Sequence, residues 1–446
     1  MFLEKLISKE QSRFLRIICM AIGFIAFESC KGGQVVEMEM PGGNSTPNIL
    51  LVIADDMGLD ATPGYDVGTE KPIMPVLQDL SANGLTFDNV WANPLCSPTR
   101  ATILTGKYGV RSGVLSATPP DNAISLPETS LQSYLSQNSS YQCAVIGKWH
   151  LSSNNNGGDD NPNLMGVEHY AGLLSGQHED YSDWSFTENG QTSTVQEYST
   201  TFFTDLAIDW IEQQQALWFL WLAYTAPHTP FHLPPNELHS SHNLSADSTD
   251  IQNNPRPYYF AMLEALDTEM GRLLATVDRQ NTLIIFIGDN GSPSRVAQAS
   301  YSRTRAKGTI YQGGIHVPMI VSGTGVSRSG QREDALINST DLFATIADVA
   351  GTGLGSIHDS KSFKNLLDDR QMEEREFIYS EIGGTTPAWT IRNLKYKLVD
   401  FQNGTQEFYD LETDPFEEND LISSGLSSEA AQARTELENF SNEVRN

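Results

Sequence analysis

Positively charged residues are scarce in this sequence. Its 446 residues include 28 lysine and arginine side chains against 56 aspartate and glutamate side chains, which gives a formal net charge of −28. A protein that binds nucleic acid normally presents a basic field to the phosphate backbone. The composition therefore argues against nucleic-acid binding, and any anionic substrate has to be attracted by a few local basic groups.

Long apolar runs are also missing. The apolar stretch at residues 17–27 follows four basic residues and is too short to span a membrane permanently. A basic start followed by a short apolar stretch is typical of an export signal. We therefore expect a signal peptide over residues 1–29. Residues 30–46 are rich in Gly, Glu, Met, Ser and Asn, without periodicity, and are expected to form a tether.

Cysteine is scarce too, with four residues in the chain. Ser29 before Cys30 resembles a loose lipoprotein processing site, which predicts a lipid anchor on Cys30. The protein is then expected in the periplasm, in the outer membrane as a lipoprotein or at the cell surface, with Cys19 removed. The alternative is a plain signal peptide that is cut elsewhere. Cys143 lies in an apolar stretch and is expected in a buried strand. We predict no disulfide between Cys96 and Cys143, although this compartment permits one.

Four continuous apolar runs predict strands that are buried on both faces, as in a parallel sheet. They cover residues 48–54, 218–224, 282–287 and 317–321. Apolar residues at helical spacing lie between them, at 260–274 and at 342–349, the latter with Ser339 or Thr340 as a cap and Gly351 as a stop. Strands that alternate with helices predict an α/β fold.

After about residue 370 the pattern changes to short, partly alternating runs. These runs cover residues 377–379, 388–391, 395–399 and 407–409. They predict a small antiparallel sheet, and residues 427–445 resemble a polar helix. We therefore divide the exported chain into a main domain, residues 47–370, and a C-terminal subdomain, residues 371–446.

Polar side chains directly follow two of the predicted buried strands. Asp55 and Asp56 follow the first, and Asp289 and Asn290 follow the run 282–287. Ligands of open α/β sheets bind beyond the carboxyl ends of strands, and four hard oxygen ligands suit Ca²⁺ or Mg²⁺. Each pair taken alone is equally compatible with an ordinary turn.

Cys96 stands at the start of a predicted helix. Ser97 is a suitable cap, Pro98 suits the first helical position, and Gly106 is a helix stop. Free N–H groups and the helix dipole favour an anion at such a position. The alternative interpretation is a buried cysteine beside a loop proline.

The stretch CSPTR at residues 96–100, followed by LTG at 104–106, resembles the signature of type I sulfatases. In that family an activating enzyme recognises Cys-x-Pro-x-Arg and oxidises the cysteine to formylglycine. Thr99 stands where serine is commoner, and Lys107 stands where arginine is usual. The resemblance implies maturation of Cys96 by a formylglycine-generating enzyme or an anaerobic sulfatase-maturating enzyme.

Further motifs extend the resemblance, in the family's order, over about residues 47–422. They are DDMG at 55–58, GKWHL at 147–151, APHTP at 226–230, GDNG at 288–291, KG at 307–308 with GGIHVP at 313–318, and YDL at 409–411 with DP at 414–415 and EN at 418–419. The family prefers Glu and Arg where this chain has Gln312 and His316. The resemblance implies an alkaline phosphatase-like fold, in which helices sandwich a large mixed, mostly parallel sheet, with residues 47–370 as the catalytic domain.

The resemblance also implies the metal and the nucleophile. Hydrated formylglycine attacks sulfur, and the sulfo-enzyme then expels sulfate. Ca²⁺, with Mg²⁺ as the alternative, orients the nucleophile and neutralises sulfate oxygens. The implied metal ligands are Asp55, Asp56, residue Cys96 in its oxidised form, Asp289 and Asn290.

Five further residues receive catalytic roles from the resemblance. Arg100, one helical turn after Cys96, reaches back towards the nucleophile and the metal ligands. Lys148 lies near the sulfate and His150 near the nucleophile's hydroxyl; in an extended stretch both face the same side. His228 and Lys307 bind the ester oxygen and protonate the leaving alcohol.

We therefore expect hydrolysis of sulfate monoesters, on an extracellular polysaccharide or oligosaccharide such as that of algae. Open alternatives are an arylsulfatase for small aryl sulfates and a phosphodiesterase or phosphonate monoester hydrolase of the same fold. A lipid-anchored binding protein on a decayed scaffold is disfavoured, because every expected catalytic position is filled. Arg295, Arg303 and Arg305 could add local positive charge, although solvated loop residues are the default interpretation.

Overall fold

The computed structural model describes residues 46–119, 122–368 and 375–446. The predicted signal peptide, the lipid anchor on Cys30 and all of the tether except residue 46 lie outside these ranges. Within them, no helix is both long enough and apolar enough to cross a membrane.

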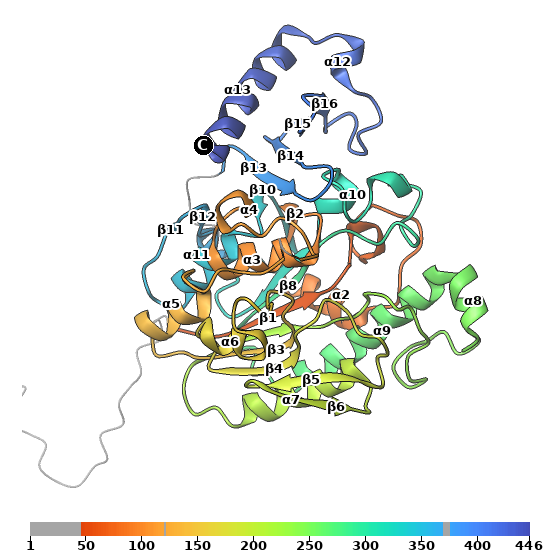
Figure 1. Ribbon diagram of the computed structural model, residues 1–446, viewed down its shortest axis with the longest axis vertical. Helices are drawn as coiled ribbons and strands as arrows, with labels where there is room; N and C mark the ends of the chain where they lie inside the picture. The colour runs from red at the N-terminus through yellow and green to blue at the C-terminus, as the bar shows by residue number, and fades with distance from the viewer. Residues whose placement is uncertain (1–45, 120–121, 369–374) are drawn as a thin grey trace, which may run out of the picture. The chain divides into compact units, whose positions relative to one another are not determined.

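Ten strands of the described chain form the main sheet, in the spatial order β10-β2-β9-β8-β1-β7-β3-β4-β5-β6 (Figure 1). Their bounds are β1 (Asn48–Ala54), β2 (Gly84–Trp91), β3 (Gln142–Lys148), β4 (His169–Leu173), β5 (Trp184–Glu188), β6 (Gln191–Val195), β7 (Trp218–Ala223), β8 (Thr282–Gly288), β9 (Met319–Gly323) and β10 (Gln331–Asn338). The central strand β1 is parallel to both β7 and β8. Strand β9, which overlaps the predicted run 317–321 but begins and ends two residues later, is buried and is antiparallel to its neighbours β8 and β2. The predicted mixed, mostly parallel sheet is confirmed.

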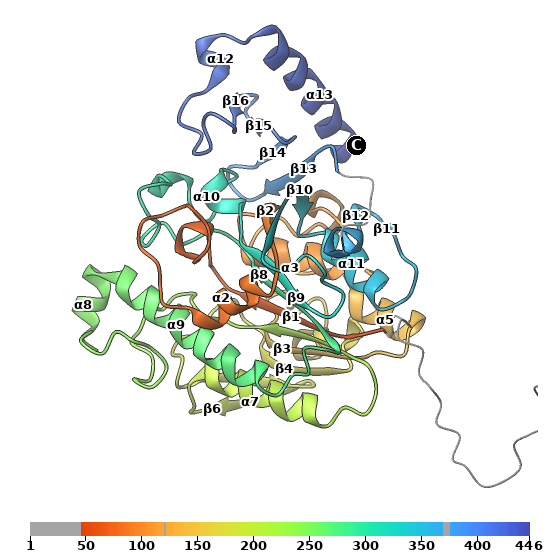
Figure 2. The ribbon, with the colours of Figure 1, turned by 180° about the vertical axis from the view of Figure 1, so that it is seen from behind.

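Helices cover both faces of this sheet, as Figures 1 and 2 show. The alternating residues of β1 divide between two apolar clusters: Ile49, Leu51 and Ile53 belong to one, and Leu50, Val52 and Ala54 to the other. The first cluster includes residues of α3 (Cys96–Thr105), α5 (Leu131–Asn138) and α11 (Asp341–Val349). The second includes residues of α2 (Pro75–Ala82), α7 (Ser199–Glu212) and α9 (Pro255–Leu274). A strand buried on both sides explains why the run 48–54 is continuously apolar.

Shorter elements connect these layers. The short helices are α4 (Gly109–Ser112), α6 (Asn161–Leu164), α8 (Ser248–Asn253) and α10 (Gln312–Ile315), with 3₁₀ turns at Leu59–Ala61, Gly158–Asp160, Arg303–Arg305 and Lys364–Asp368. Strands β11 (Ser356–Ile357) and β12 (Ser360–Lys361) form a small antiparallel pair.

A second, four-stranded antiparallel sheet follows near the C-terminus, as predicted. It consists of β13 (Ile378–Ile382), β14 (Ala388–Arg392), β15 (Tyr396–Phe401) and β16 (Gln406–Asp410). After the short α12 (Leu421–Ser424), α13 (Ser428–Arg445) packs its apolar residues into the same cluster as the strands. The Ser427 side chain accepts a hydrogen bond from the Ala430 N–H and caps α13.

The parallel order brings several strand ends to one edge of the main sheet. Ala54 at the end of β1 is in register with Gly288 at the end of β8. Strand β3 ends at Lys148, and α3 begins at Cys96. The residues that follow these strand ends build the candidate site.

Candidate active site

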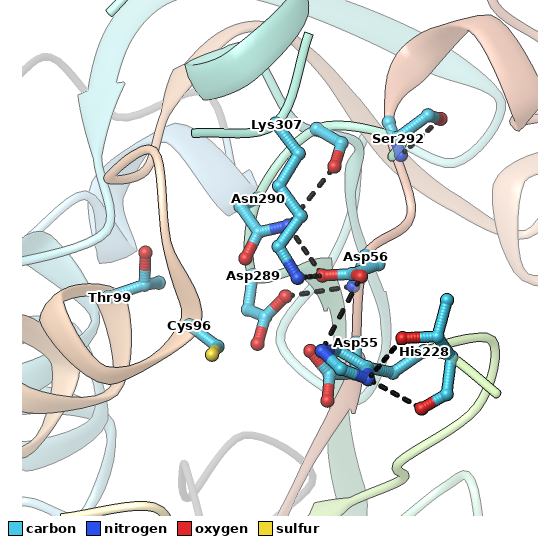
Figure 3. A network of polar contacts seen from close by, with 12 residues as sticks. Asp55, Asp56, Cys96, Thr99, His228, Asp289, Asn290, Ser292 and Lys307 are labelled. Carbon is cyan, nitrogen blue, oxygen red and sulfur yellow. Dashed lines mark hydrogen bonds and ion pairs between the residues drawn. The ribbon is translucent and has the colours of Figure 1, made fainter. Parts of the chain in front are cut away.

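The four polar residues after β1 and β8 lie together, as Figure 3 shows. The Asp56 backbone N–H donates to Asp289 Oδ1 over 3.0 Å, and the Asn290 side-chain amide donates to Asp56 Oδ1 over 2.8 Å. Asp289 N donates to Ala54 O, which joins the second turn to the end of β1. Asp56 has a positive φ of 70°, which turns the chain back at the strand end.

This cluster has the chemistry of a cation site. Asp55, Asp56 and His228 can each offer one ligand atom, and these atoms lie within 4.8 Å of one another. Asp55 Oδ1 and Asn290 Oδ1 are buried and accept no hydrogen bond from the described residues. A buried oxygen without a partner is costly, and a hard divalent cation is a suitable partner for it. The residues present therefore fit the Ca²⁺ or Mg²⁺ that the sequence predicts.

Each buried carboxylate also contacts a different cationic side chain. Lys148 Nζ lies 2.5 Å from Asp55 Oδ2, and Arg100 Nη2 lies 2.9 Å from Asp289 Oδ2. Lys307 Nζ lies 2.5 Å from Asp56 Oδ1. Burial raises the pKa of Asp56, but Lys307 and His228 outweigh burial and hold the pKa below its ordinary value. These three cations supply the local positive charge that the acidic composition lacks.

Cys96 is buried at the first position of α3, with its Sγ 3.2 Å from His150 Nδ1. Burial raises the pKa of the Cys96 thiol, and Lys148 opposes that shift. The start of the helix is therefore not sufficient to make this thiol anionic at neutral pH.

The predicted cap of this helix is wrong. Helix α3 begins at Cys96, with Leu95 as its N-cap and no side-chain cap. Ser97 therefore lies inside the first turn, and its hydroxyl donates to His150 O over 2.8 Å. The helix ends at Thr105, and Gly106 is its C-cap, with a left-handed φ of 66°, so the predicted stop is confirmed.

His150 departs from the extended conformation that its sequence predicts. Its φ is 60°, in the left-handed region, because the chain turns directly after β3. The ring nevertheless reaches Cys96, so that Lys148 and His150 both face the site. Burial, followed by Lys148 and Arg100, lowers the pKa of His150 well below its ordinary value, so the ring is neutral at neutral pH.

His228 approaches the acidic cluster from the segment after β7. Its Nδ1 lies 2.8 Å from Thr229 O and donates to it, which leaves Nε2 facing Asp56 Oδ2 at 3.8 Å. Burial lowers the pKa of His228, and Asp56 opposes the shift. The Tyr181 hydroxyl donates to His228 O over 2.7 Å and holds this segment.

Sequence reasoning missed the residues that support these turns. The Tyr259 hydroxyl, on α9, donates to Asp56 O over 2.9 Å. The Ser292 hydroxyl donates to Asp60 Oδ1 over 2.6 Å and accepts from Gly58 N. Ser292 stands two residues after Asn290, so its position was a usable signal. Tyr259 and Tyr181 had none, because only the packing brings them to the site.

Several other residues singled out from the sequence lie apart from the acidic cluster. The Trp91 indole donates to Gln312 Oε1 over 2.9 Å, and His316 Nε2 donates to Asp88 O over 2.7 Å. Arg295 donates to Gln252 O. Gln312 and His316 stand where the resemblance leads one to expect Glu and Arg. The Gln312 side chain contacts a tryptophan, and the His316 side chain contacts a main-chain carbonyl.

Comparison with known proteins gives concordant matches. Residues 47–352 match the family model described as Sulfatase, and residues 304–443 match the model described as N-sulphoglucosamine sulphohydrolase, C-terminal. The chain is 29% identical over 363 residues to the uncharacterized sulfatase YdeN of Escherichia coli, covering 68% of this chain and 62% of that protein. It is 26% identical over 413 residues to human N-acetylgalactosamine-6-sulfatase, covering 83% and 75%.

Solved structures share the fold. A crystal structure of Ps i-CgsB in complex with k-i-k-neocarrahexaose has a TM-score of 0.72 at 24% identity and covers 89% of this chain and 93% of that one. The structure of BT4656 in complex with its substrate D-glucosamine-2-N,6-O-disulfate has a TM-score of 0.73 at 22% identity. The match covers 90% of this chain and 98% of that one. The match to mouse arylsulfatase J is 27% identical over 331 residues and covers 69% of this chain. It covers only 53% of the length of that protein.

Proposed function

Because the chain belongs to the sulfatase family, whose model matches residues 47–352, we propose that it hydrolyses sulfate monoesters. One observation carries the proposal. Three buried carboxylates, each paired with a different cationic side chain, lie beside the buried Cys96 at the edge of the main sheet. Such a site can hold a divalent cation and still present positive charge to a sulfate group.

The proposal includes two groups that complete the site. Ca²⁺, or alternatively Mg²⁺, would be held by Asp55, Asp56, Asp289 and Asn290, and it would neutralise sulfate oxygens. Cys96, oxidised to formylglycine by a maturating enzyme, would supply a nucleophile that can also release sulfate. The unpartnered oxygens of Asp55 and Asn290 support the metal, and the CSPTR stretch supports the oxidation.

The chain's own residues then bind and orient the ester. Arg100 fixes Asp289 and also donates to Lys148 O over 2.7 Å, so it holds both strand ends. Lys148 is placed to bind sulfate oxygens. His150, neutral and 3.2 Å from Sγ, is placed to exchange a proton with a hydroxyl at position 96.

Departure of the alcohol also needs assistance. His228 Nε2 and Lys307 Nζ both face Asp56, from two different segments. We assign to this pair the positioning of the ester oxygen, and to the Lys307 ammonium its protonation as the bond to sulfur breaks. General acid assistance of this kind is typically worth about 10²–10⁴-fold in rate.

Carbohydrate sulfates are the proposed substrate class. The human relative is named for an N-acetylgalactosamine 6-sulfate. One structural relative was solved with a glucosamine disulfate as its substrate, and the other with the oligosaccharide k-i-k-neocarrahexaose. We also propose that the activity lies outside the cytoplasm, on extracellular glycans such as those of algae, because the sequence predicts an export signal over residues 1–29 and a lipid anchor on Cys30.

The test measures sulfate release from a panel of sulfated oligosaccharides and aryl sulfates, with the protein made alongside a maturating enzyme. We expect turnover, and a Cys96 peptide whose mass is that of formylglycine. Cys96→Ala should abolish turnover with the circular dichroism spectrum unchanged. The matched control is Cys143→Ala, a buried cysteine inside β3 that should retain activity. Turnover of phosphate diesters alone would refute the proposal.

A further inference from the structure

The loop that carries Lys307, residues 305–312, is held at both of its ends by the C-terminal sheet and the segment that follows it. Lys397, on β15, is fully buried and donates from Nζ to Ile310 O over 2.8 Å. The same ammonium lies 2.5 Å from Glu417 Oε1. Glu417 Oε2 in turn accepts from the Gln312 backbone N–H over 2.7 Å. One buried ion pair thus fixes the downstream end of the loop.

The upstream end is fixed by the same glutamate's main chain. Arg305 donates from Nη1 to Glu417 O and from Nη2 to the Tyr409 hydroxyl, the latter over 3.3 Å. Its guanidinium lies 4.5 Å from the centroid of the Tyr311 ring, which adds a cation–π contact. Glu417 has a positive φ of 62°, so its backbone is turned to serve both ends of the loop.

Lys307 lies between these two attachments. Its backbone N–H donates to Ser292 O over 3.1 Å, and the next residue, Gly308, donates to Pro94 O over 2.9 Å. Its side chain reaches the acidic cluster with Nζ 2.5 Å from Asp56 Oδ1. A shift of either end of the loop therefore moves the ammonium relative to the site, and a misplacement of about 1 Å can cost ~10²-fold in rate.

The sequence motif pointed to a neighbouring residue. Glu418 and Asn419, which match the family's C-terminal pattern, are exposed, whereas Glu417 is 1% exposed and makes the contacts. Burial lowers the pKa of Lys397 to about 8, and Glu417 opposes the shift, so the lysine stays charged at neutral pH. Removing one partner of such a pair leaves an uncompensated buried charge.

We propose that Lys397 and Glu417 are positioning residues for Lys307, through which the C-terminal subdomain sets the geometry of leaving-group protonation. This inference rests on the role proposed above for Lys307. The C-terminal subdomain contacts the loop that carries Lys307, so its effect on the reaction passes through Lys307. The position of Lys307 in turn sets how strongly the rate depends on the basicity of the leaving alcohol.

The experiment compares two substrates that differ in that basicity. An alkyl or sugar sulfate needs its leaving oxygen protonated, whereas 4-nitrophenyl sulfate releases a weakly basic phenolate. For Glu417→Gln we expect kcat on the sugar sulfate to fall about 10–100-fold. On 4-nitrophenyl sulfate, kcat should fall by less than about threefold. KM should change little on either substrate. A lower fraction of folded enzyme would reduce both rates equally.

Two further variants keep the test independent of folding. The double variant Lys397→Met/Glu417→Gln removes both buried charges at similar volume, so it should fold at least as well as the single variant. It still loses the contact to Ile310 O and should show the same substrate-dependent loss. Leu398→Ala, in the apolar cluster beside Lys397, should lower the melting temperature with both rates retained.

Lys307→Ala, measured in parallel, separates the two proposals. If it shows the substrate-dependent loss and both Glu417 variants do not, the positioning role is wrong and the proposed function stands. If Lys307→Ala itself lacks that dependence, the role of Lys307 is wrong and the positioning proposal falls with it. Equal losses on both substrates in the Glu417 variants and in Leu398→Ala would also overturn the proposal.

Discussion

At the scale of single residues, Gly176, in the loop after β4, lies against the His150 ring. A Cβ placed on Gly176 would lie 2.4 Å from both Cε1 and Nε2 of that ring. The missing side chain is what allows the ring to lie 3.2 Å from Cys96 Sγ. A glycine in a polar loop carries no signal of this contact in the sequence.

We expect Gly176→Ala to displace the His150 ring and to lower kcat by up to ~10²-fold. The backbone of Gly176 is outside the left-handed region, so the melting temperature should change little. Gly355→Ala is the matched control, because a Cβ there meets no atom within 4 Å. Steady-state kinetics and a thermal melt of both variants test this, and an unchanged kcat in Gly176→Ala would contradict the packing argument.

At the scale of the element, α2 shows how a helix start depends on another helix. Its N-cap, Met74, provides no side-chain cap. Asp267 of α9 instead accepts hydrogen bonds from Val76 N over 2.9 Å and Leu77 N over 2.8 Å. The chain positions differ by about 190 residues, so the usual sequence signals of a cap do not apply here.

Burial raises the pKa of Asp267 to about 6 from 3.8, although the two N–H donors oppose the shift. The folded state then binds a proton more tightly than the unfolded state, so the free energy of unfolding should fall as pH rises from about 4 to about 6. Two pKa units correspond to about 3 kcal/mol as an upper bound.

Asp267→Asn should remove this component of the pH dependence, because the amide does not titrate. Urea unfolding of both proteins at a series of pH values measures it. If the free energy of unfolding changes with pH between 4 and 6 by the same amount in the variant as in the original protein, other carboxyl groups produce that change.

At the scale of the whole molecule, the acidic cluster joins segments that are far apart in the chain. Asp56 and Asp289, for example, are separated by 233 positions and follow the ends of the neighbouring strands β1 and β8. A cation bound there is linked to folding, because the unfolded chain does not bring these ligands together.

Ca²⁺ should therefore stabilise the whole protein, by about 2.7 kcal/mol at a concentration a hundred times its dissociation constant. Chelation with EDTA should lower the melting temperature by a few degrees, and added Ca²⁺ should restore it. Asp55→Asn, which weakens the site, should show a much smaller shift on Ca²⁺ addition. A melting temperature that is insensitive to both reagents would contradict the metal assignment.

Residues in contiguous motifs were the predictable part of the site. Buried parallel strands and a helix start are local patterns, and they indicated that Asp55, Asp289 and Cys96 lie at the ends of such elements. The resemblance of the contiguous motifs to the sulfatase signature then implied the roles of these residues. The caps were less predictable. Ser97 looked like a cap, but the helix begins two residues earlier than that cap predicts, at Cys96. The Ser97 hydroxyl donates to His150 O instead.

The amino-acid sequence by itself determined the α/β fold and the order of the motifs, because burial on both faces of a strand and helical periodicity are local properties. Only the tertiary structure decided which distant side chains support the site. Tyr259 holds the Asp56 turn, and Glu417 holds the Lys307 loop. Such contacts arise where separate elements pack against each other, and the spacing along the chain holds no trace of that packing.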